Sequence, residues 1–145
     1  MKDVHPDNAV TRLNPPGEFH RGCFACGQNN ADGLRMQFTR SGDKTCGTIT
    51  IDGRFQGYNN IAQGGIVATL LDTAMVQLLH TLHGGNPLTG RLDIRYHAPT
   101  PLYTPLTVCA SALGKRGDTC WAEAEILAGT TCCATAEGVF RLFND

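Results

Sequence analysis

The chain of 145 residues has the length of one domain and can bury one hydrophobic core. Its 12 basic and 13 acidic side chains give a net charge of -1, which argues against a nucleic-acid binder and against a protein held electrostatically on a membrane. With 41% hydrophobic and 17% charged residues the chain should fold, and 17 glycines favour a turn-rich, sheet-rich architecture.

The beginning of the chain is polar, contains Pro6, Pro15 and Pro16, and shows no hydrophobic period. We expect residues 1–20 to form a tail or an arm and residues 21–145 to form one domain. No secretory signal is visible, and the longest run without many charges, residues 61–83, is too polar for a membrane span. We therefore expect a cytoplasmic protein whose seven cysteines are reduced thiols.

Two strands and a helix are expected in the first half. Alternating apolar residues predict a strand over 34–38, and β-branched residues predict a second over 45–51, with a turn at 41–44 between them. From Ile66 to Leu82 the apolar residues recur at helical spacing and nearly encircle the axis. We expect a buried central helix of about 20 residues, ended by a Gly-Gly-Asn-Pro stretch.

Strands follow the helix. The period of two returns over residues 88–96, and three more strands over 106–113, 119–127 and 131–143 form a meander. The inward positions of its last two strands are small, which would let the sheet curl closely around the helix: Ala122, Ala124, Ala134, Ala136 and Gly138. The sequence predicts an α+β fold, with one long central helix wrapped by a curved, mostly antiparallel sheet of five or six strands.

Asp72 is the only formal charge in the expected helix. Its neighbours three and four positions away are mostly apolar: Ala68, Thr69, Met75 and Val76. Burying a carboxylate in such surroundings is costly and raises its pKa, so proteins keep one there mainly where it is paired or used. Asp72 is a candidate catalytic residue; the alternative is a solvated Asp or a structural hydrogen-bond acceptor.

The helix begins at Gln63-Gly64-Gly65. The first backbone N–H groups of a helix lack internal partners and point toward a nearby anion or carbonyl oxygen. Glycines let a ligand approach that backbone closely. We interpret the segment as a candidate oxyanion site; the alternative is that the glycines only form a tight turn.

Cys23 and Cys26 have the spacing of half a zinc site. His20 and Cys46 offer further donors, but no spacing demands either, and no second cysteine pair has the spacing of a zinc site. A redox pair of this spacing would be expected at the start of a helix, whereas a polar loop follows here. We therefore expect a structural turn and no metal.

Three stretches together resemble the hotdog-fold thioesterases, in particular the PaaI-like branch. Residues 58–75 (YNNIAQGGIVATLLDTAM) are similar to the central-helix motif of that family, HGG followed by a helical Asp or Glu. Residues 23–34 (CFACGQNNADGL) are similar to the CFxCGxxNxxGL opening of many members, and residues 88–99 to the strand after the helix. The resemblance covers about residues 20–143.

The resemblance implies an acyl-CoA thioesterase that needs no cofactor. A backbone N–H of Gly64 or Gly65 would polarise the thioester carbonyl, and Asp72 would act as general base or nucleophile. Thr89 falls where several members place a residue that holds the attacking water. In this family the site lies between two subunits, so the partners expected are an acyl-CoA substrate and further copies of the chain, in a homodimer or a tetramer, with no nucleic acid and no membrane.

Further residues are candidates for binding the substrate. They are Asn59 and Asn60 before the helix, Arg91 and Arg95 on one strand face, and Lys115 and Arg116 in a hairpin loop. The cations could meet phosphates or be solvated surface.

One position departs from the family pattern, because the family's His is Gln63 here. Gln exchanges hydrogen bonds but cannot carry a proton near neutral pH. A non-catalytic acyl-CoA-binding protein is therefore the main alternative. A hotdog dehydratase or hydratase ranks below it, because His80 and His83 lie beyond Asp72 at the helix end.

Overall fold

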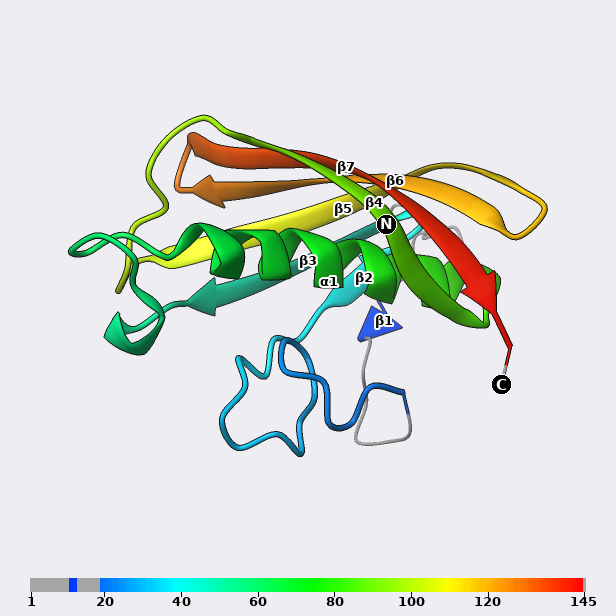
Figure 1. Cartoon of the computed structure of the whole chain (residues 1–145), viewed down its shortest axis with the longest axis horizontal. Helices are drawn as coiled ribbons and strands as arrows, with labels where there is room; N and C mark the ends of the chain where they lie inside the picture. The colour runs from blue at the N-terminus through cyan, green and yellow to red at the C-terminus, as the bar shows by residue number, and fades with distance from the viewer. Residues whose placement is uncertain (1–10, 13–18, 145) are drawn as a thin grey trace, which may run out of the picture.

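The computed structural model describes residues 11–12 and 19–144. Over these residues one long helix lies across one face of a curved sheet (Figure 1). In chain order the elements are β1 (Thr11–Arg12), β2 (Thr39–Ser41), β3 (Lys44–Thr50), a 3-10 turn η2 (Gly53–Phe55), α1 (Gly64–His83), β4 (Asn86–Tyr96), β5 (Pro105–Arg116), β6 (Thr119–Ala128) and β7 (Thr131–Phe143).

The strands of the described chain form one sheet in the order β1-β2-β3-β5-β6-β7-β4, and all their pairings are antiparallel. β1 has only two residues, so the other six strands form the body of the sheet. α1 connects β3 to β4, and β4 lies at the far edge, where it pairs with β7 on one side only. The α+β prediction of a central helix on a six-stranded antiparallel sheet is confirmed.

α1 is the core helix that its all-round apolar pattern predicts. Half of its 20 residues are buried, among them Leu70, Met75 and Leu78. By length and apolar composition α1 could cross a membrane, but in this fold it packs against β3, β4, β5, β6 and β7. Gly84 ends the helix with a positive φ of 69°, a conformation that glycine adopts without strain.

The small residues of β6 and β7 do let the sheet approach α1 closely. Ala122 and Ala134 are completely buried, and Ala124 and Ala136 are nearly so. A Cβ atom on Gly138 would lie 3.2 Å from the sulfur of Met75 on the helix and would collide with the ring of Phe140. A larger side chain at this position would displace the Phe140 ring, which is packed in the core.

The strand predicted over residues 34–38 is wrong, because β2 begins only at Thr39. Met36 and Phe38 are buried, as their alternation indicates. The segment pairs with a loop instead: the backbone N–H groups of Leu34 and Met36 donate to the carbonyls of Phe24 and Ala25, at 2.8 and 2.9 Å. The alternation therefore reflects burial of alternate side chains in an extended segment. The backbone of this segment is hydrogen-bonded to the loop that contains Cys23 and Cys26.

The proposed N-terminal tail falls largely outside the described residues. Thr11 and Arg12 pair with Arg40 and Thr39 of β2. At the other end of the tail, the ring of Phe19 stacks on His80 of α1 with centroids 3.5 Å apart.

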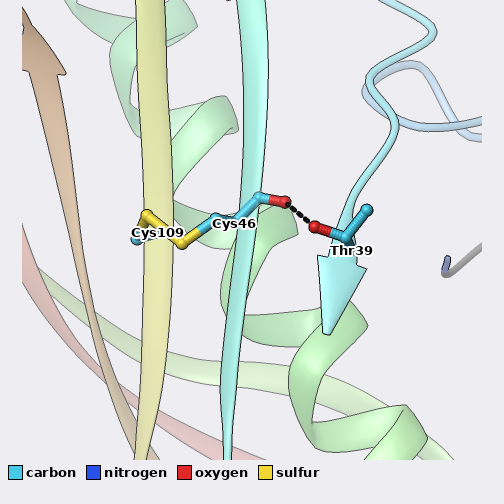
Figure 2. Close-up of a disulfide and its surroundings, with 3 residues drawn as sticks. All are labelled: Thr39, Cys46 and Cys109. Atoms are coloured by element: carbon cyan, nitrogen blue, oxygen red, sulfur yellow. Dashed lines mark hydrogen bonds between the residues drawn. A yellow bond between two sulfur atoms is a disulfide. The ribbon is translucent and has the colours of Figure 1, made fainter. Parts of the chain in front are cut away.

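The expectation that all cysteines are reduced is wrong for one pair. Cys46 of β3 and Cys109 of β5 are directly opposite in the strand register and form a disulfide (Figure 2). The Thr39 hydroxyl donates to the Cys46 carbonyl at 3.4 Å, which ties β2 to the same point. The two cysteines are 63 positions apart, so only the pairing of β3 with β5 brings them together.

Candidate active site

The start of α1 is capped by a side chain. Gln63 precedes the helix with extended backbone, and its Oε1 accepts hydrogen bonds from the N–H groups of Gly65 and Ile66. The amide of Gly65 is therefore engaged. Within the described residues the Gly64 N–H has no acceptor, and Gly64 is exposed. Of the two glycines, Gly64 offers the available carbonyl donor.

Tyr96, at the end of β4, lies beside this helix start. Its hydroxyl donates to the Gly64 carbonyl at 2.7 Å, although the side chain is 55% exposed. Tyr96 is not among the site residues predicted from the sequence. The signal was present, because Tyr96 continues the helix-facing alternation of Leu92 and Ile94.

In the middle of α1, Asp72 meets Thr89 of β4. The Thr89 hydroxyl donates to Oδ1 of Asp72 at 2.6 Å. A register shift between Thr89 and Arg91 makes this possible, because the extra residue Gly90 lets both Thr89 and Leu92 face the helix. The structure thus brings together two residues that the sequence placed in one site.

The Asp72 carboxyl is half-buried, and this burial raises its pKa above the ordinary value. The hydrogen bond from Thr89 acts in the opposite direction, because it stabilises the charged form. The charges of Cys23 and His20 also influence the pKa of Asp72, so both groups lie nearby. A carboxylate with a raised pKa is a better base near neutral pH than an ordinary one.

The two halves of the proposed site are far apart within one chain. Asp72 is eight positions after Gly64 on α1, which separates them by about 12 Å along the axis at about 1.5 Å per residue. A thioester carbonyl cannot be held by one and attacked through the other at that distance.

The proposed substrate-binding residues are dispersed. Asn59 and Asn60 are exposed in the loop before α1, where the Asn60 carbonyl accepts from the N–H of Leu102 at 3.1 Å. Lys115 and Arg116 are exposed at the end of β5. Partial burial, and then the charge of Lys115, lower the pKa of His83 at the far end of α1.

Arg91 and Arg95 point away from the helix, because they alternate with its neighbours Leu92 and Ile94 on β4. Arg91 lies 3.8 Å from Asp93 in an exposed ion pair. Arg95 lines a hollow of about 520 Å³ together with several carboxylates: Asp93, Glu123, Glu125 and Glu137. Within one chain these arginines are not near Asp72.

A third group of side chains comes from the loop before β2 and lies against α1. The possible ligand atoms of His20, Cys23 and Cys26 are all within 4.8 Å of one another. Hydrogen bonding to Cys26, and then to His20, lowers the pKa of the Cys23 thiol to about 3. The neighbouring Cys23 and burial raise the pKa of Cys26.

Comparisons with known proteins identify the family of the chain. Residues 59–134, just over half of the chain, match the family model described as Thioesterase superfamily. None of the curated proteins matches the chain significantly.

Solved structures extend the match. The thioesterase superfamily protein RHA08564 has a TM-score of 0.76 and 28% identity over 83% of this chain, which spans 60% of that protein. Escherichia coli PaaI has a TM-score of 0.70 and 18% identity, with 77% and 81% of the two chains covered. A hypothetical thioesterase from Streptococcus pneumoniae, solved with coenzyme A, has a TM-score of 0.67 and 19% identity, with 71% and 83% covered.

The fold and the site define a hotdog protein with a carboxylate on its central helix. The chain belongs to the thioesterase superfamily.

Proposed function

We propose that the protein is an acyl-CoA thioesterase, which hydrolyses an acyl thioester to a carboxylic acid and free CoA. The observation that carries the proposal is the half-buried Asp72, held by Thr89 on the central helix of a thioesterase-superfamily chain. The structural neighbour from Streptococcus pneumoniae contains coenzyme A, and a further one, from Streptococcus mutans, is bound to acetyl-CoA. Both are under 25% identical, so they support the substrate class only by analogy.

The chemistry follows from the two regions of α1. The Gly64 N–H donates to the thioester carbonyl oxygen and stabilises the oxyanion, worth about 3 kcal/mol for one such donor. Asp72 accepts a proton from a water molecule, whose oxygen bonds to the carbonyl carbon. The C–S bond then breaks, CoA leaves as the thiol after taking up that proton, and the acid remains. Direct attack by the Asp72 carboxylate is the alternative route.

The site requires two copies of the chain, because about 12 Å of helix separates Gly64 from Asp72. β4 supplies the place where a second copy can join. It has 11 residues and hydrogen-bonds to a neighbour on one side only, and Leu88 and Tyr96 on it are more than half exposed. A long unpaired edge strand favours pairing with another chain. We place the carbonyl donor and the carboxylate on different subunits of a homodimer.

The substitution of Gln63 for the family's His is compatible with turnover. Its Oε1 caps the helix by accepting N–H hydrogen bonds, a task that needs an acceptor and no titratable proton. The capped helix keeps its first N–H, that of Gly64, directed outward.

A complementation assay tests both the activity and the shared site. Thiol release is measured over a panel of acyl-CoAs for the wild type, Asp72→Asn, Gly64→Pro, and a 1:1 mixture of the two variants after subunit exchange. Each variant alone should be nearly inactive. The mixture should recover about a quarter of wild-type activity, because half the dimers are mixed and each has one intact site.

The non-catalytic alternative makes a different prediction. A wild type that binds acyl-CoA in a dialysis experiment but releases no thiol from any member of the panel would contradict the proposed function. Turnover without recovery in the mixture would instead contradict only the two-subunit site.

A further inference from the structure

The sulfur and nitrogen donors beside α1 come from one short loop. His20, Cys23 and Cys26 each direct one ligand atom to a common point, and the Cys26 sulfur lies 3.7 Å from Nδ1 of His20. The sequence spacing of Cys23 and Cys26 does not reveal the third ligand, because the position of the His20 ring depends on how the chain turns before the two cysteines. Cys46, which the sequence also offered as a metal ligand, forms a disulfide with Cys109 instead.

The backbone of the loop is shaped for this arrangement. The N–H of Cys23 donates to the His20 carbonyl at 3.0 Å, and the N–H of Gly27 donates to the Cys23 carbonyl at 2.8 Å. A Cβ atom at Gly27 would collide with the backbone of Arg21 and Cys23, so the turn is only possible with glycine there. The turn therefore places both sulfurs and the imidazole on its inner side.

The separation of one sulfur and the imidazole matches an edge of a tetrahedral metal site. Zn²⁺ binds a thiolate at about 2.3 Å and an imidazole at about 2.0 Å, which puts sulfur and nitrogen about 3.5 Å apart at a tetrahedral angle. The observed separation of 3.7 Å between Sγ of Cys26 and Nδ1 of His20 is close to this edge. Two sulfurs and one imidazole form a soft donor set, which suits zinc better than magnesium or calcium.

The side chains around the cluster are hydrogen-bond donors. Nε2 of Gln77, which is 1% exposed, donates to the Cys26 sulfur at 3.1 Å. The Thr73 hydroxyl, also on α1, is buried and has no hydrogen-bond partner among the described residues. A neutral thiol accepts only weakly, whereas metal-bound thiolates are regularly held by such outer donors. Gln77 is a buried polar residue of the core helix that the thioesterase chemistry does not use.

We propose that His20, Cys23 and Cys26 bind one Zn²⁺ ion, which cross-links the loop that carries them beside α1. This replaces the expectation of no metal, which rested on the count of close cysteine pairs. The described residues supply three ligands, so a water molecule or another donor completes the tetrahedron. None of the three ligands takes part in the proposed hydrolysis.

Metal analysis tests the site directly. The reduced apoprotein is titrated with Zn²⁺, and with Co²⁺ for its absorption spectrum, and the bound metal is measured after desalting. We expect about one ion per chain and a thiolate-to-cobalt charge-transfer band. Cys23→Ser and His20→Ala should each lose the band, whereas Cys132→Ser, a thiol on β7 outside the cluster, should keep both the band and the ion.

Gln77→Leu gives a finer test, because it removes the donor to sulfur without opening a cavity. We expect a Zn²⁺ affinity at least about 10-fold weaker with unchanged stoichiometry. Zinc should also slow hydrogen exchange in residues 19–36 of the wild type, and not in Cys23→Ser. A folded, reduced wild type that binds no zinc would overturn the proposal, and so would equal zinc binding by Cys132→Ser and Cys23→Ser.

Discussion

The start and the middle of α1 differ in what they offer a substrate. At the start, the Gly64 N–H is a backbone group on an exposed helix end, and Gln63 occupies the next two amides. In the middle, Asp72 is a half-buried side chain whose pKa is raised by burial and moderated by Thr89. In the proposed mechanism the first region recognises a carbonyl oxygen and the second removes a proton. Because both regions lie on one helix, their separation is fixed, and the proposed site therefore combines the start of one helix with the middle of the helix of a second copy.

The largest effect is expected at Asp72. Asp72→Asn keeps the shape and an acceptor for Thr89 but loses the base, so kcat should fall at least about 100-fold. Its stability should not fall. With its folded pKa raised, Asp72 binds protons more readily in the folded state, so its contribution to stability decreases as pH rises above 3.8 and through the raised value.

At neutral pH Asp72→Asn should therefore melt at or above the wild-type temperature. Steady-state kinetics and thermal melts on the same preparation make the comparison. Near-native turnover, or a collapse in stability, would assign Asp72 to a structural role.

Gly64→Pro removes the backbone donor at the other region. The substitution fits the fold, because proline is favoured at the first helical position and Gln63 before it is already extended, with ψ of 139°. The kcat should fall about 100-fold, the lower range for one oxyanion donor.

Gly64→Ala is the matched control, since it keeps the N–H and its Cβ would lie 3.7 Å from the Tyr96 hydroxyl, an ordinary contact. It should retain most activity. Equal losses in both variants would show that bulk at this position, and not the N–H, is what matters.

Thr89→Val sharpens the description of the middle region. Losing the hydroxyl raises the pKa of Asp72 further, so the acid limb of the kcat profile should move to higher pH. A hydrogen bond to a charged group is worth about 1.5–3 kcal/mol, so activity on that limb should fall about 10-fold or more.

The loss in Thr89→Val should shrink at alkaline pH, where Asp72 is charged in both proteins. Thr89→Ser keeps the donor and should follow the wild-type profile. A pH-independent loss in Thr89→Val would mean that Thr89 acts on the water or the substrate and not through Asp72.

The smallest effect is expected at Gln63. Gln63→Ala removes the cap of α1 and should lower the free energy of unfolding by about 1 kcal/mol, while Gln63→Ser restores a capping oxygen and most of the stability. Chemical denaturation measures both. Activity should change little, because the Gly64 N–H has no hydrogen-bond acceptor that the substitution could remove. A rise in kcat would indicate that the N–H of Gly65, released from Gln63, is the group that donates to the thioester carbonyl.

Local pattern was sufficient for most of the fold. The helical period between Ile66 and Leu82 predicts α1, and the alternation after it predicts β7 over 131–143 with the observed bounds. These patterns are visible in the sequence because buried positions recur at a regular interval along each helix or strand. The segment over 34–38 shows the limit, since alternation reports which side chains are buried and not whether the backbone pairs with a strand or a loop.

The sequence by itself also identified two parts of the candidate site: Asp72, a lone charge in an apolar helix, and the glycines at the helix start. Only the tertiary structure decided that Gln63 occupies the Gly65 amide, that Thr89 meets Asp72 across a bulge, and that His20 joins Cys23 and Cys26. It likewise paired Cys46 with Cys109 through neighbouring strands. The physical reason is common to all four: each contact depends on a short-range hydrogen bond, ligand geometry or covalent bond. Such contacts form only where the packed chain brings two atoms within a few ångströms, and residue type and spacing do not encode that distance.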